Sequence, residues 1–473
     1  MDSLTSHDLD HFFKPASLAV VGATPNKSKG GYSIMANMLE QFRGPIYPVN
    51  PRYEEILGVK CYPSISAIPA PVELAIVFVP AHAVPAVIED AVRAGVKAAL
   101  VESGGFAETG PEGQRLQDEM MAIARRAGIR IWGPNCTGLV NTREVIFTPF
   151  MRLPHVELSQ IRGNVSIIAQ SGMLAAGYML QMISSGFFKL GKACAIGNKA
   201  DIDETEVLEY LAGDADTEVV MAYLESIVDG RAFLEAARRT VASKPLIVLK
   251  SGRTREAAQA AMSHTASLAG ADEVIEGALR QIGAFRARDF MQMMRIGKAF
   301  SLNPQPFETA SPNGDQVALV TVSGGGGVVT IDLMSSHGLY PAKLDPATID
   351  KLKQVFPPWM PPSNPVDIWP AIEQVGVERA VGESLCAVLE DDNVDGAILL
   401  TFASRDTAGF PAQKLGEACG RLHKPIISWV FGDVRFFDEY RQRMEGQGIP
   451  VYDELETCVE AMAAYLIYAK ARR

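Results

Sequence analysis

The chain has 473 residues and a formal net charge of −11, and its basic residues form no cluster suited to nucleic acid or an anionic membrane. Hydrophobic residues make up 48% and charged residues 21%, as is typical of soluble globular proteins, and the length indicates about three domains. No signal core, no membrane-length apolar run and no zinc or disulfide spacing of the six cysteines is present. We therefore expect a cytoplasmic protein with free thiols and no metal site.

The first part of the chain alternates short apolar runs with amphipathic segments, which predicts a parallel sheet covered by helices. The expected strands lie at residues 17–24, 46–51, 74–81, 98–106 and 129–136. Each ends in Gly, Pro, Asn or Ser, and ligands of such sheets bind at the carboxyl ends of the strands. Any single one of these segments is explained as a tight turn, but all of them together predict a nucleotide-like ligand.

The loop after the first strand does not match the dinucleotide-binding fingerprint. Gly22 is followed only by Gly30 and Gly31, so the Gly-x-Gly-x-x-Gly spacing is absent. A nicotinamide-dependent dehydrogenase is therefore a weaker alternative, and it predicts NAD binding that calorimetry would detect.

A second module follows residues 148–162, which we interpret as a linker because they contain two prolines and no periodicity. Its first expected strand, residues 165–172, ends in Ser171 and Gly172, and a helix is expected from Met173 onward. The serine hydroxyl and the backbone N–H groups then lie at the positive end of that helix. This arrangement predicts an anion-binding site.

The rest of the chain contains an internal repeat, because residues 165–300 can be aligned with residues 317–470. Ser171 and Ser323 occupy the same place in the two copies, and a glycine follows each of them after fifteen residues. A Lys-Pro dipeptide also precedes a strand in both copies. We therefore expect an α/β protein in which a Rossmann-like domain precedes two flavodoxin-like domains.

The two copies differ where chemistry is expected. The first has Glu225 at the end of its middle strand and His264 within the small-residue segment 263–270, whereas the second has Thr401 and no Ser-His-Thr. A scaffold keeps structural residues in both copies, but a reaction centre is needed once. A lone histidine is commonly a core or surface residue, yet this difference favours His264 and Glu225 as a functional pair, with the carboxylate orienting the imidazole.

Seven motifs follow one another along the chain. They are Glu102-Ser-Gly-Gly-Phe106-Ala-Glu108-Thr-Gly, Gly133-Pro-Asn-Cys136, Gln170-Ser-Gly172, Gly197-Asn-Lys-Ala-Asp201, Tyr223-Leu-Glu225, Ser263-His264-Thr265 with Leu268-Ala-Gly270, and Asn364-Pro-Val-Asp367. In this order they resemble the motifs of the nucleoside-diphosphate-forming acyl-CoA synthetases, the group of ADP-forming acetate–CoA ligase, related to the succinyl-CoA synthetase α subunit. The resemblance covers about residues 12–465. Where family members often have Ser-His-Thr-Gly-Ala, this chain has Ala266 and Ser267 after the threonine.

The resemblance implies a role for each group of residues. His264 would be a transient phosphohistidine, Glu225 its carboxylate partner, and Ser171, Gly172 and Met173 the helix N-terminus that holds the phosphoryl group. Cys136 would line the thiol end of the cleft without acting as a nucleophile. The implied coenzyme A residues are Gly22, Ala23, Thr24, Asn50, Pro51, Val79, Pro80, Ala81, Glu102, Ser103, Asn135 and Cys136.

The resemblance also implies a partner. Fused family members carry an ATP-grasp domain, for which this chain has no room, so we expect an α subunit that joins a separate ATP-grasp β subunit, as a heterotetramer. That subunit would bind most of the ATP or ADP and Mg²⁺, while this chain, with domains at residues 1–147, 163–300 and 315–473, would bind coenzyme A and a small carboxylic acid. A coenzyme A-binding regulatory or scaffold protein without turnover is the alternative.

Overall fold

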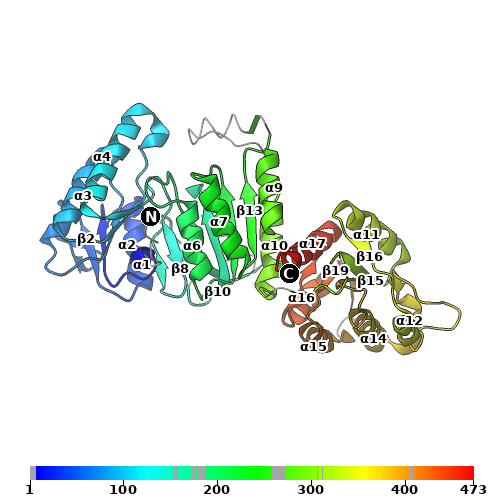
Figure 1. The fold of residues 1–473 in the computed structure, drawn as a ribbon. Helices are drawn as coiled ribbons and strands as arrows, with labels where there is room; N and C mark the ends of the chain where they lie inside the picture. Colours follow the sequence, from blue (N-terminus) through cyan, green and yellow to red (C-terminus); the bar gives the residue numbers. More distant parts are fainter. Residues whose placement is uncertain are drawn as a thin grey trace. The chain divides into compact units, whose positions relative to one another are not determined.

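The computed structural model of the chain describes residues 7–152, 158–172, 177, 181, 188–254, 256–257, 272–305, 307–311, 313–404 and 409–472. These residues form two compact units, one from the N-terminus to Ile282 together with residues 286–290, and one from residues 283–285 and 291 onward. Figure 1 shows that each unit is built of sheets with helices against them. None of the described helices is long and apolar enough to cross a membrane.

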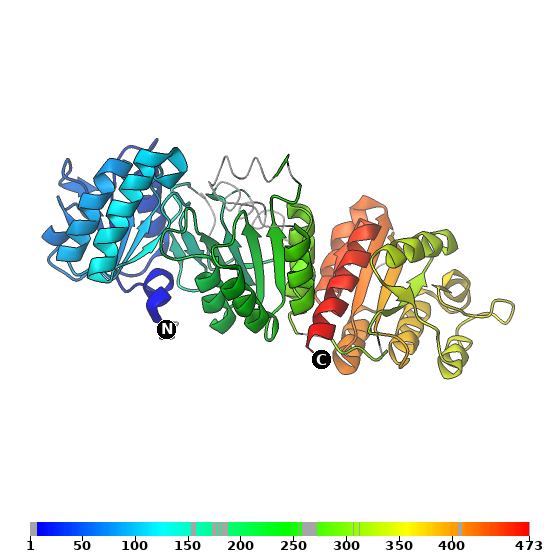
Figure 2. The ribbon, with the colours of Figure 1, turned by 45° about the horizontal axis from the view of Figure 1, so that its top comes forward.

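The N-terminal sheet is parallel and has the strand order β2-β1-β5-β6-β7. Its strands are β1 (Leu18–Val21), β2 (Ile46–Val49), β5 (Leu74–Val77), β6 (Ala98–Val101) and β7 (Arg130–Trp132). Alternate residues of the strands, such as Ala75 and Val77, pack in one core with α3 (Val84–Arg93) and α4 (Pro111–Ala127). Figure 2 shows these two helices side by side over the sheet. All five expected strands are present, and α2 (Gly30–Gln41) follows β1 as predicted.

The second sheet of the first unit has the order β14-β13-β12-β10-β11-β8-β9. Its parallel strands include β10 (Arg162–Ala169), β11 (Leu190–Ala195), β12 (Val219–Leu224) and β13 (Leu246–Lys250), with β14 (Phe285–Arg286) at one edge. The helices that accompany this sheet are α6 (Glu204–Gly213), α7 (Gly230–Val241) and α9 (Asp272–Ile282) (Figure 1). Because β12 is buried along its whole length and β10 from Val165 onward, these stretches read as largely apolar runs.

A hairpin of β8 (Leu139–Asn141) and β9 (Ile146–Phe147) completes this second sheet, with β8 antiparallel to β11. Sequence reasoning placed these residues with the first domain and treated residues 148–162 as a linker. Thr148 is fully buried, and its hydroxyl accepts a hydrogen bond from the N–H of Leu139 at 2.8 Å. Because β9 also contacts α2, the helix that follows β1, the hairpin connects the two sheets of the first unit, and the three-domain division stays a prediction.

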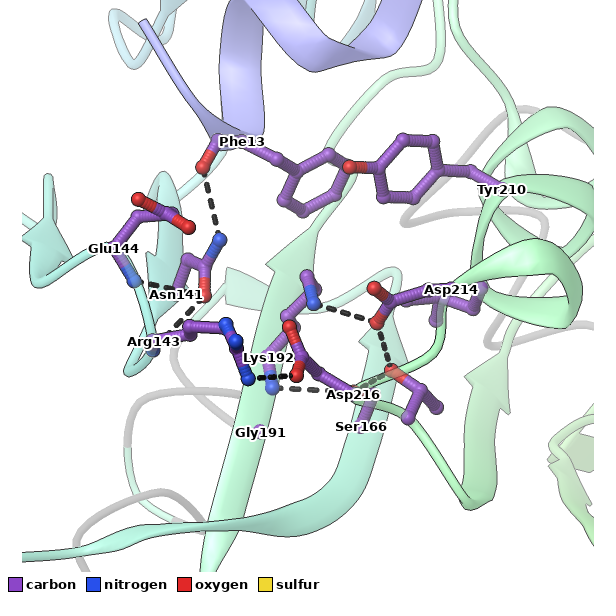
Figure 3. Close-up of polar contacts among 12 residues, drawn as sticks. Phe13, Asn141, Arg143, Glu144, Ser166, Gly191, Lys192, Tyr210, Asp214 and Asp216 are labelled. Atoms are coloured by element: carbon purple, nitrogen blue, oxygen red, sulfur yellow. Dashed lines mark hydrogen bonds and ion pairs between the residues drawn. The ribbon is translucent and has the colours of Figure 1, made fainter.

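The short N-terminal helix α1 (His7–Phe13) lies between the two sheets of the first unit. The ring of Phe13 contacts Trp132 of β7 at 5.6 Å and stacks on Tyr210 of α6 at 4.5 Å. Figure 3 shows Phe13 opposite Tyr210, with the side chain of Asn141 donating to the Phe13 carbonyl at 2.8 Å. These contacts add to the connection that the hairpin makes.

The second unit contains a parallel sheet of order β16-β15-β18-β19-β20, with β17 (Val366–Asp367) beside β15. Its strands are β15 (Gln316–Thr321), β16 (Tyr340–Pro341), β18 (Gly396–Ala403), β19 (Ile426–Gly432) and β20 (Val451–Tyr452). The accompanying helices are α10 (Phe290–Leu302), α11 (Gly324–Ser336), α12 (Pro346–Leu352), α13 (Trp369–Val375), α14 (Val377–Leu389), α15 (Ala412–Leu422), α16 (Phe437–Glu445) and α17 (Leu455–Ala471).

The strand orders agree with the predicted repeat. In the second sheet the sequence β14-β13-β12-β10-β11 corresponds strand for strand to β20-β19-β18-β15-β16 in the second unit. Ser171 lies two residues after the end of β10 and Ser323 two residues after the end of β15, so the two aligned serines follow equivalent strands. The predicted pair of flavodoxin-like sheets is therefore confirmed.

Candidate functional site

A cleft of about 710 Å³ lies in the first unit where the carboxyl ends of strands from its two sheets meet. From the N-terminal sheet it takes residues that follow β5, β6 and β7, and from the second sheet residues that follow β10, β11 and β12. Its walls include Phe78, Glu102, Glu108, Asn135, Cys136, Thr137, Gln170, Ser171, Gly172, Asn198, Lys199, Glu225 and Ser226. The ends of parallel strands are where such folds bind ligands.

Two tight turns form the floor between the sheets. The Gly133–Asn135 turn contacts the Gly197–Lys199 turn through a hydrogen bond from the N–H of Asn198 to the Pro134 carbonyl at 2.9 Å. Gly197 has φ +57°, and a Cβ there would lie 2.3 Å from the Pro134 oxygen, so only glycine fits. The glycine therefore sets how closely the two strand ends approach.

The residues after Cys136 pack directly on the Ser171–Gly172 turn. The hydroxyl of Thr137 donates to the Gly172 carbonyl at 3.1 Å, and a Cβ on Gly172 would lie 2.9 Å from the Thr137 methyl carbon. Cys136 itself is buried, and burial raises the pKa of its thiol, which keeps it protonated. This supports the interpretation of Cys136 as part of the cleft wall and not as a nucleophile.

The end of β12 is held by a dense set of hydrogen bonds. The side-chain oxygen of Gln170 accepts from the backbone N–H groups of Glu225 and Ser226, both at 2.9 Å. The Lys250 ammonium donates to the Glu225 carbonyl at 2.8 Å, and the Tyr223 hydroxyl donates to Glu225 Oε1 at 3.2 Å. Because backbone and carboxylate are both fixed, Glu225 presents its side chain to the cleft with little freedom.

A second network holds the loop after β6. Glu108 Oε1 accepts from the N–H groups of Gly105 and Phe106 at 2.6 and 3.1 Å, and Glu108 Oε2 accepts from Asn198 at 2.6 Å. Burial alone would raise the pKa of Glu108, but these hydrogen bonds, led by that from Asn198, lower it below its ordinary value. Glu108 is therefore an ionised structural carboxylate that joins the two halves of the cleft wall.

Glu102 differs from Glu108, because neither of its oxygens has a hydrogen-bond partner in the described chain. Its side chain is 3% exposed, and burial raises the pKa of Glu102 well above its ordinary value. The nearby Thr148 hydroxyl lowers that pKa, but burial has the larger effect. Burial in the cleft wall therefore favours the protonated form of Glu102.

The predicted coenzyme A turns all lie at the carboxyl edge of the N-terminal sheet. Gly22 has φ +92°, and the Asn50 side chain donates to the Ala23 carbonyl at 2.8 Å, which joins the turns after β1 and β2. Ser103 accepts from the Val79 N–H at 3.0 Å, which joins the turns after β5 and β6. Pro51, Pro80, Ala81 and Thr24 lie on the same turns.

The first turn of α2 has the properties of a phosphate site. Lys29 precedes the helix and its side chain makes no capping hydrogen bond, so the residue at the N-cap gives the first N–H groups of α2 no side-chain acceptor. A Cβ on Gly31 would lie 2.2 Å from the Gly22 carbonyl oxygen, so the helix start packs tightly on the turn after β1. This cradle fits a phosphate-bearing ligand such as coenzyme A.

The structure brings together in the cleft six of the residues singled out by sequence: Glu102, Asn135, Cys136, Ser171, Gly172 and Glu225. The predicted coenzyme A residues after β1 and β2, residues 79–81 after β5 and Ser103 after β6 lie at the same sheet edge but do not line this cleft. His264 and Met173 lie outside the described residues, so the structure says nothing of them. Their roles, like those of the other site residues, stay predictions.

Sequence reasoning gave no role to four residues of the cleft: Glu108, Asn198, Lys199 and Ser226. The first three stood inside recognised motifs, but hydrogen bonds such as Asn198–Glu108 and Lys199–Ser226 join segments that are far apart in sequence. Ser226 was not singled out at all, and nothing in the sequence marks it except its place after Glu225. Only the geometry of the strand ends distinguishes these residues.

Comparison with protein-family models matches two segments of the chain. Residues 16–142 match the CoA binding domain, and residues 162–300 match the succinyl-CoA ligase like flavodoxin domain. The two matched segments are those whose sheets form the cleft.

The chain is also similar to characterised proteins over nearly its whole length. It is 39% identical to the ADP-forming acetate–CoA ligase II of Archaeoglobus fulgidus over 99% of this chain and 68% of that protein. It is 36% identical to subunit alpha of the ADP-forming acetate–CoA ligase II of Pyrococcus furiosus, over 98% of each chain. A solved structure of the dinucleotide-forming acetyl-coenzyme A synthetase 1 of Candidatus Korarchaeum cryptofilum superposes with a TM-score of 0.85 at 32% identity, covering 98% of both chains. A second structure of that enzyme, in complex with phosphate and ADP, gives a TM-score of 0.84.

Proposed function

The chain belongs to the nucleoside-diphosphate-forming acyl-CoA synthetase family, and from this premise we propose that it is the α subunit of an ADP-forming carboxylate–CoA ligase. The reaction joins a small carboxylic acid to coenzyme A while ATP is cleaved to ADP and phosphate, or runs in reverse to make ATP. The observation that carries the proposal is the shared cleft, which places the strand ends of the CoA-binding segment beside Ser171, Gly172 and Glu225.

In the acyl-CoA-forming direction, a phosphoryl group on His264 passes to the carboxylate, which breaks the N–P bond and forms an acyl phosphate. The coenzyme A sulfur then attacks the acyl carbon, and phosphate leaves with the C–O bond electrons. A neutral imidazole accepts the phosphoryl group in the reverse direction, and the Glu225 carboxylate orients it. The backbone N–H groups after Ser171 stabilise the negative phosphoryl oxygens.

The nucleotide half of the reaction is assigned to a partner. We assign binding of ATP or ADP with Mg²⁺ to a separate ATP-grasp β subunit, and a heterotetramer to the assembly. The support is that the Pyrococcus furiosus relative is named a subunit alpha and matches this chain from end to end. The absence of a membrane-spanning helix among those described fits a cytoplasmic enzyme.

Labelling of the histidine tests this function. The purified chain is incubated with [³²P]phosphate and an acyl-CoA panel that begins with acetyl-CoA, and acid-labile label on the protein is measured. The wild-type chain is expected to incorporate label that depends on acyl-CoA, and His264→Asn is expected to incorporate none. His423→Asn is the matched control, because His423 caps α15 with φ 52°, a conformation that asparagine tolerates. Label that persists in His264→Asn contradicts the proposal.

A further inference from the structure

The hydroxyl of Ser226 is a fixed element of the cleft to which neither sequence nor family comparison gives a role. Ser226 follows β12 and lines the cleft beside Glu225, Ser171 and Gly172. Its backbone N–H donates to Gln170 and its carbonyl accepts from Lys199 at 3.0 Å. Hydrogen bonds therefore hold both backbone groups of Ser226. The direction of its O–H proton depends on the contacts of the side-chain oxygen.

The orientation of the Gln170 amide follows from its backbone partners. One end of the amide lies 2.9 Å from both the Glu225 N–H and the Ser226 N–H, so that end must be the oxygen, because two N–H donors need an acceptor. The NH₂ group is thereby directed at Ser226 Oγ, to which it donates at 2.9 Å. This donor is set by the fold and does not depend on a chosen rotation of the amide.

Lys199 supplies a second donor to the same oxygen. Its ammonium donates to Ser226 Oγ and to the Ser226 carbonyl, both at 3.0 Å, and to Glu204 Oε2 at 2.8 Å. The Lys199 side chain is 4% exposed and that of Glu204 is fully buried. Each of the three N–H groups of the Lys199 ammonium has an acceptor within the protein. Lys199 therefore positions Ser226 and has no N–H group left to donate to a ligand.

A serine oxygen has two lone pairs and one proton, and here both lone pairs receive donors from Gln170 and Lys199. The O–H proton must then point away from both of them. No acceptor for it lies among the described residues, and Ser226 is only half-buried on the cleft side. The hydrogen bond from the ammonium also polarises the hydroxyl and makes it a stronger donor.

We propose that Ser226 is a ligand-binding residue whose hydroxyl donates to a phosphoryl oxygen in the cleft. The phosphoryl group is favoured as the acceptor because Ser226 shares the cleft with the Ser171–Gly172 turn, whose backbone N–H groups attract the same oxygens. The inference rests on the proposed function, which brings phosphate to this cleft. Two sources carry the same chemistry, namely free phosphate and the phosphorylated histidine.

Titration of inorganic phosphate into the CoA-saturated chain tests the first source by calorimetry. Removal of a hydrogen bond to a charged group in Ser226→Ala is expected to raise the phosphate Kd roughly tenfold to a hundredfold. Ser226→Thr keeps the hydroxyl and is expected to stay within about threefold of wild type. Ser243→Ala removes a hydroxyl that bonds to the Thr240 carbonyl at the far end of α7, and it is the matched control that should change nothing.

The second source is tested by the acyl-CoA-dependent labelling described above. If Ser226 contacts the phosphorylated histidine, Ser226→Ala leaves the phosphate Kd unchanged but lowers the labelled fraction about tenfold, and Ser226→Thr restores it. Equal phosphate affinity and equal labelling of Ser226→Ala and wild type, with equal melting temperatures, overturn the inference while the proposed function stands. Failure of wild type to label counts against the proposed function, and the phosphate titration then decides the role of Ser226 by itself.

Discussion

Arg130 and Glu206 form a two-pronged ion pair, with Arg130 Nη1 2.8 Å from Glu206 Oε1 and Nη2 2.7 Å from Oε2. Arg130 belongs to β7 of the N-terminal sheet and Glu206 to α6 of the second sheet, so the pair joins the two halves of the cleft-bearing unit. Asp201 accepts from Arg130 Nε at 2.9 Å and completes the set of acceptors around the guanidinium. Only a planar guanidinium can satisfy all of these oxygens at once.

Replacement of Arg130 by lysine is therefore expected to destabilise the chain. Lysine cannot make the paired contact with Glu206, and both side chains are about four-fifths buried, so the loss is expected to be roughly 1–3 kcal/mol. Thermal unfolding monitored by circular dichroism measures it. The control is Arg115→Lys on α4, whose contacts with Glu112 and Glu119 are exposed and should contribute almost nothing. Equal melting temperatures for both variants would contradict this prediction.

The buried pair of Lys192 and Asp214 predicts a larger effect. Their charged atoms lie 2.5 Å apart, and the two side chains are 1% and 7% exposed. Figure 3 shows the Lys192 ammonium directed at the Asp214 carboxylate. Burial alone would raise the pKa of Asp214, but hydrogen bonds from Lys192 and Thr217 hold that pKa below its ordinary value. Asp214→Asn leaves the lysine charge buried without its partner and should cost about 3–5 kcal/mol. Chemical denaturation should show that adding Lys192→Met to Asp214→Asn recovers part of this loss, and no recovery would argue against pairing as the cause.

Glu102 predicts a dependence of stability on pH. The folded-state pKa of Glu102 is raised above the unfolded value, so its stability contribution is complete below about pH 4.3 and is lost as pH rises towards the folded pKa. Glu102→Gln has the same shape and cannot ionise. The melting temperature of Glu102→Gln relative to wild type should therefore rise between pH 4 and pH 8, by an amount equivalent to roughly 1–3 kcal/mol.

The control for this measurement is Glu89→Gln, because Glu89 is exposed on α3. The change in melting temperature of Glu102→Gln with pH is compared with that of this surface variant. A difference between Glu102→Gln and wild type that stays constant across the pH range would mean that Glu102 does not titrate with a raised pKa.

Gly197→Ala should disturb the cleft floor. The new Cβ would meet the Pro134 oxygen at 2.3 Å, and φ +57° disfavours any side chain, so a loss of about 2 kcal/mol or more is expected. Gly213→Ala at the end of α6 has no atom within 4 Å of its new Cβ and should be neutral or slightly stabilising. Differential scanning calorimetry compares the two variants directly. A Gly197→Ala chain as stable as Gly213→Ala would show that the turn can move.

Glu225→Gln should impair phosphoryl transfer, because Glu225 orients the histidine, without destabilising the fold. The amide keeps the size of the side chain but loses its charge, so acyl-CoA-dependent labelling from [³²P]phosphate should fall at least about 10²-fold. The melting temperature should change little, because the backbone of Glu225 is held independently by Gln170 and Lys250. Labelling at the wild-type rate would remove Glu225 from the proposed reaction.

The amino-acid sequence determined the classes of secondary structure and their order. Buried parallel strands such as β5 and β18 read as apolar runs because both faces of the sheet are covered, and each run ends in a turn residue that a parallel strand needs. The repeat was visible for the same reason, since both copies must bury equivalent strands. The aligned serines Ser171 and Ser323 follow equivalent strands in the structure.

Only the tertiary structure decided which residues meet in the cleft. The two strands of the β8–β9 hairpin are short and buried, so no alternation of polar and apolar residues marks them as the edge of the second sheet. Lys199 stands in a motif without an assigned role by sequence, but in space its three ammonium hydrogen bonds go to Glu204 and Ser226. Hydrogen bonds between segments that are distant in sequence form only where the strand ends of the two sheets come together, and the packing of the sheets determines where that happens. The sequence thus determines which strands form. Their packing determines that Ser226 faces the cleft with no acceptor for its O–H proton among the described residues.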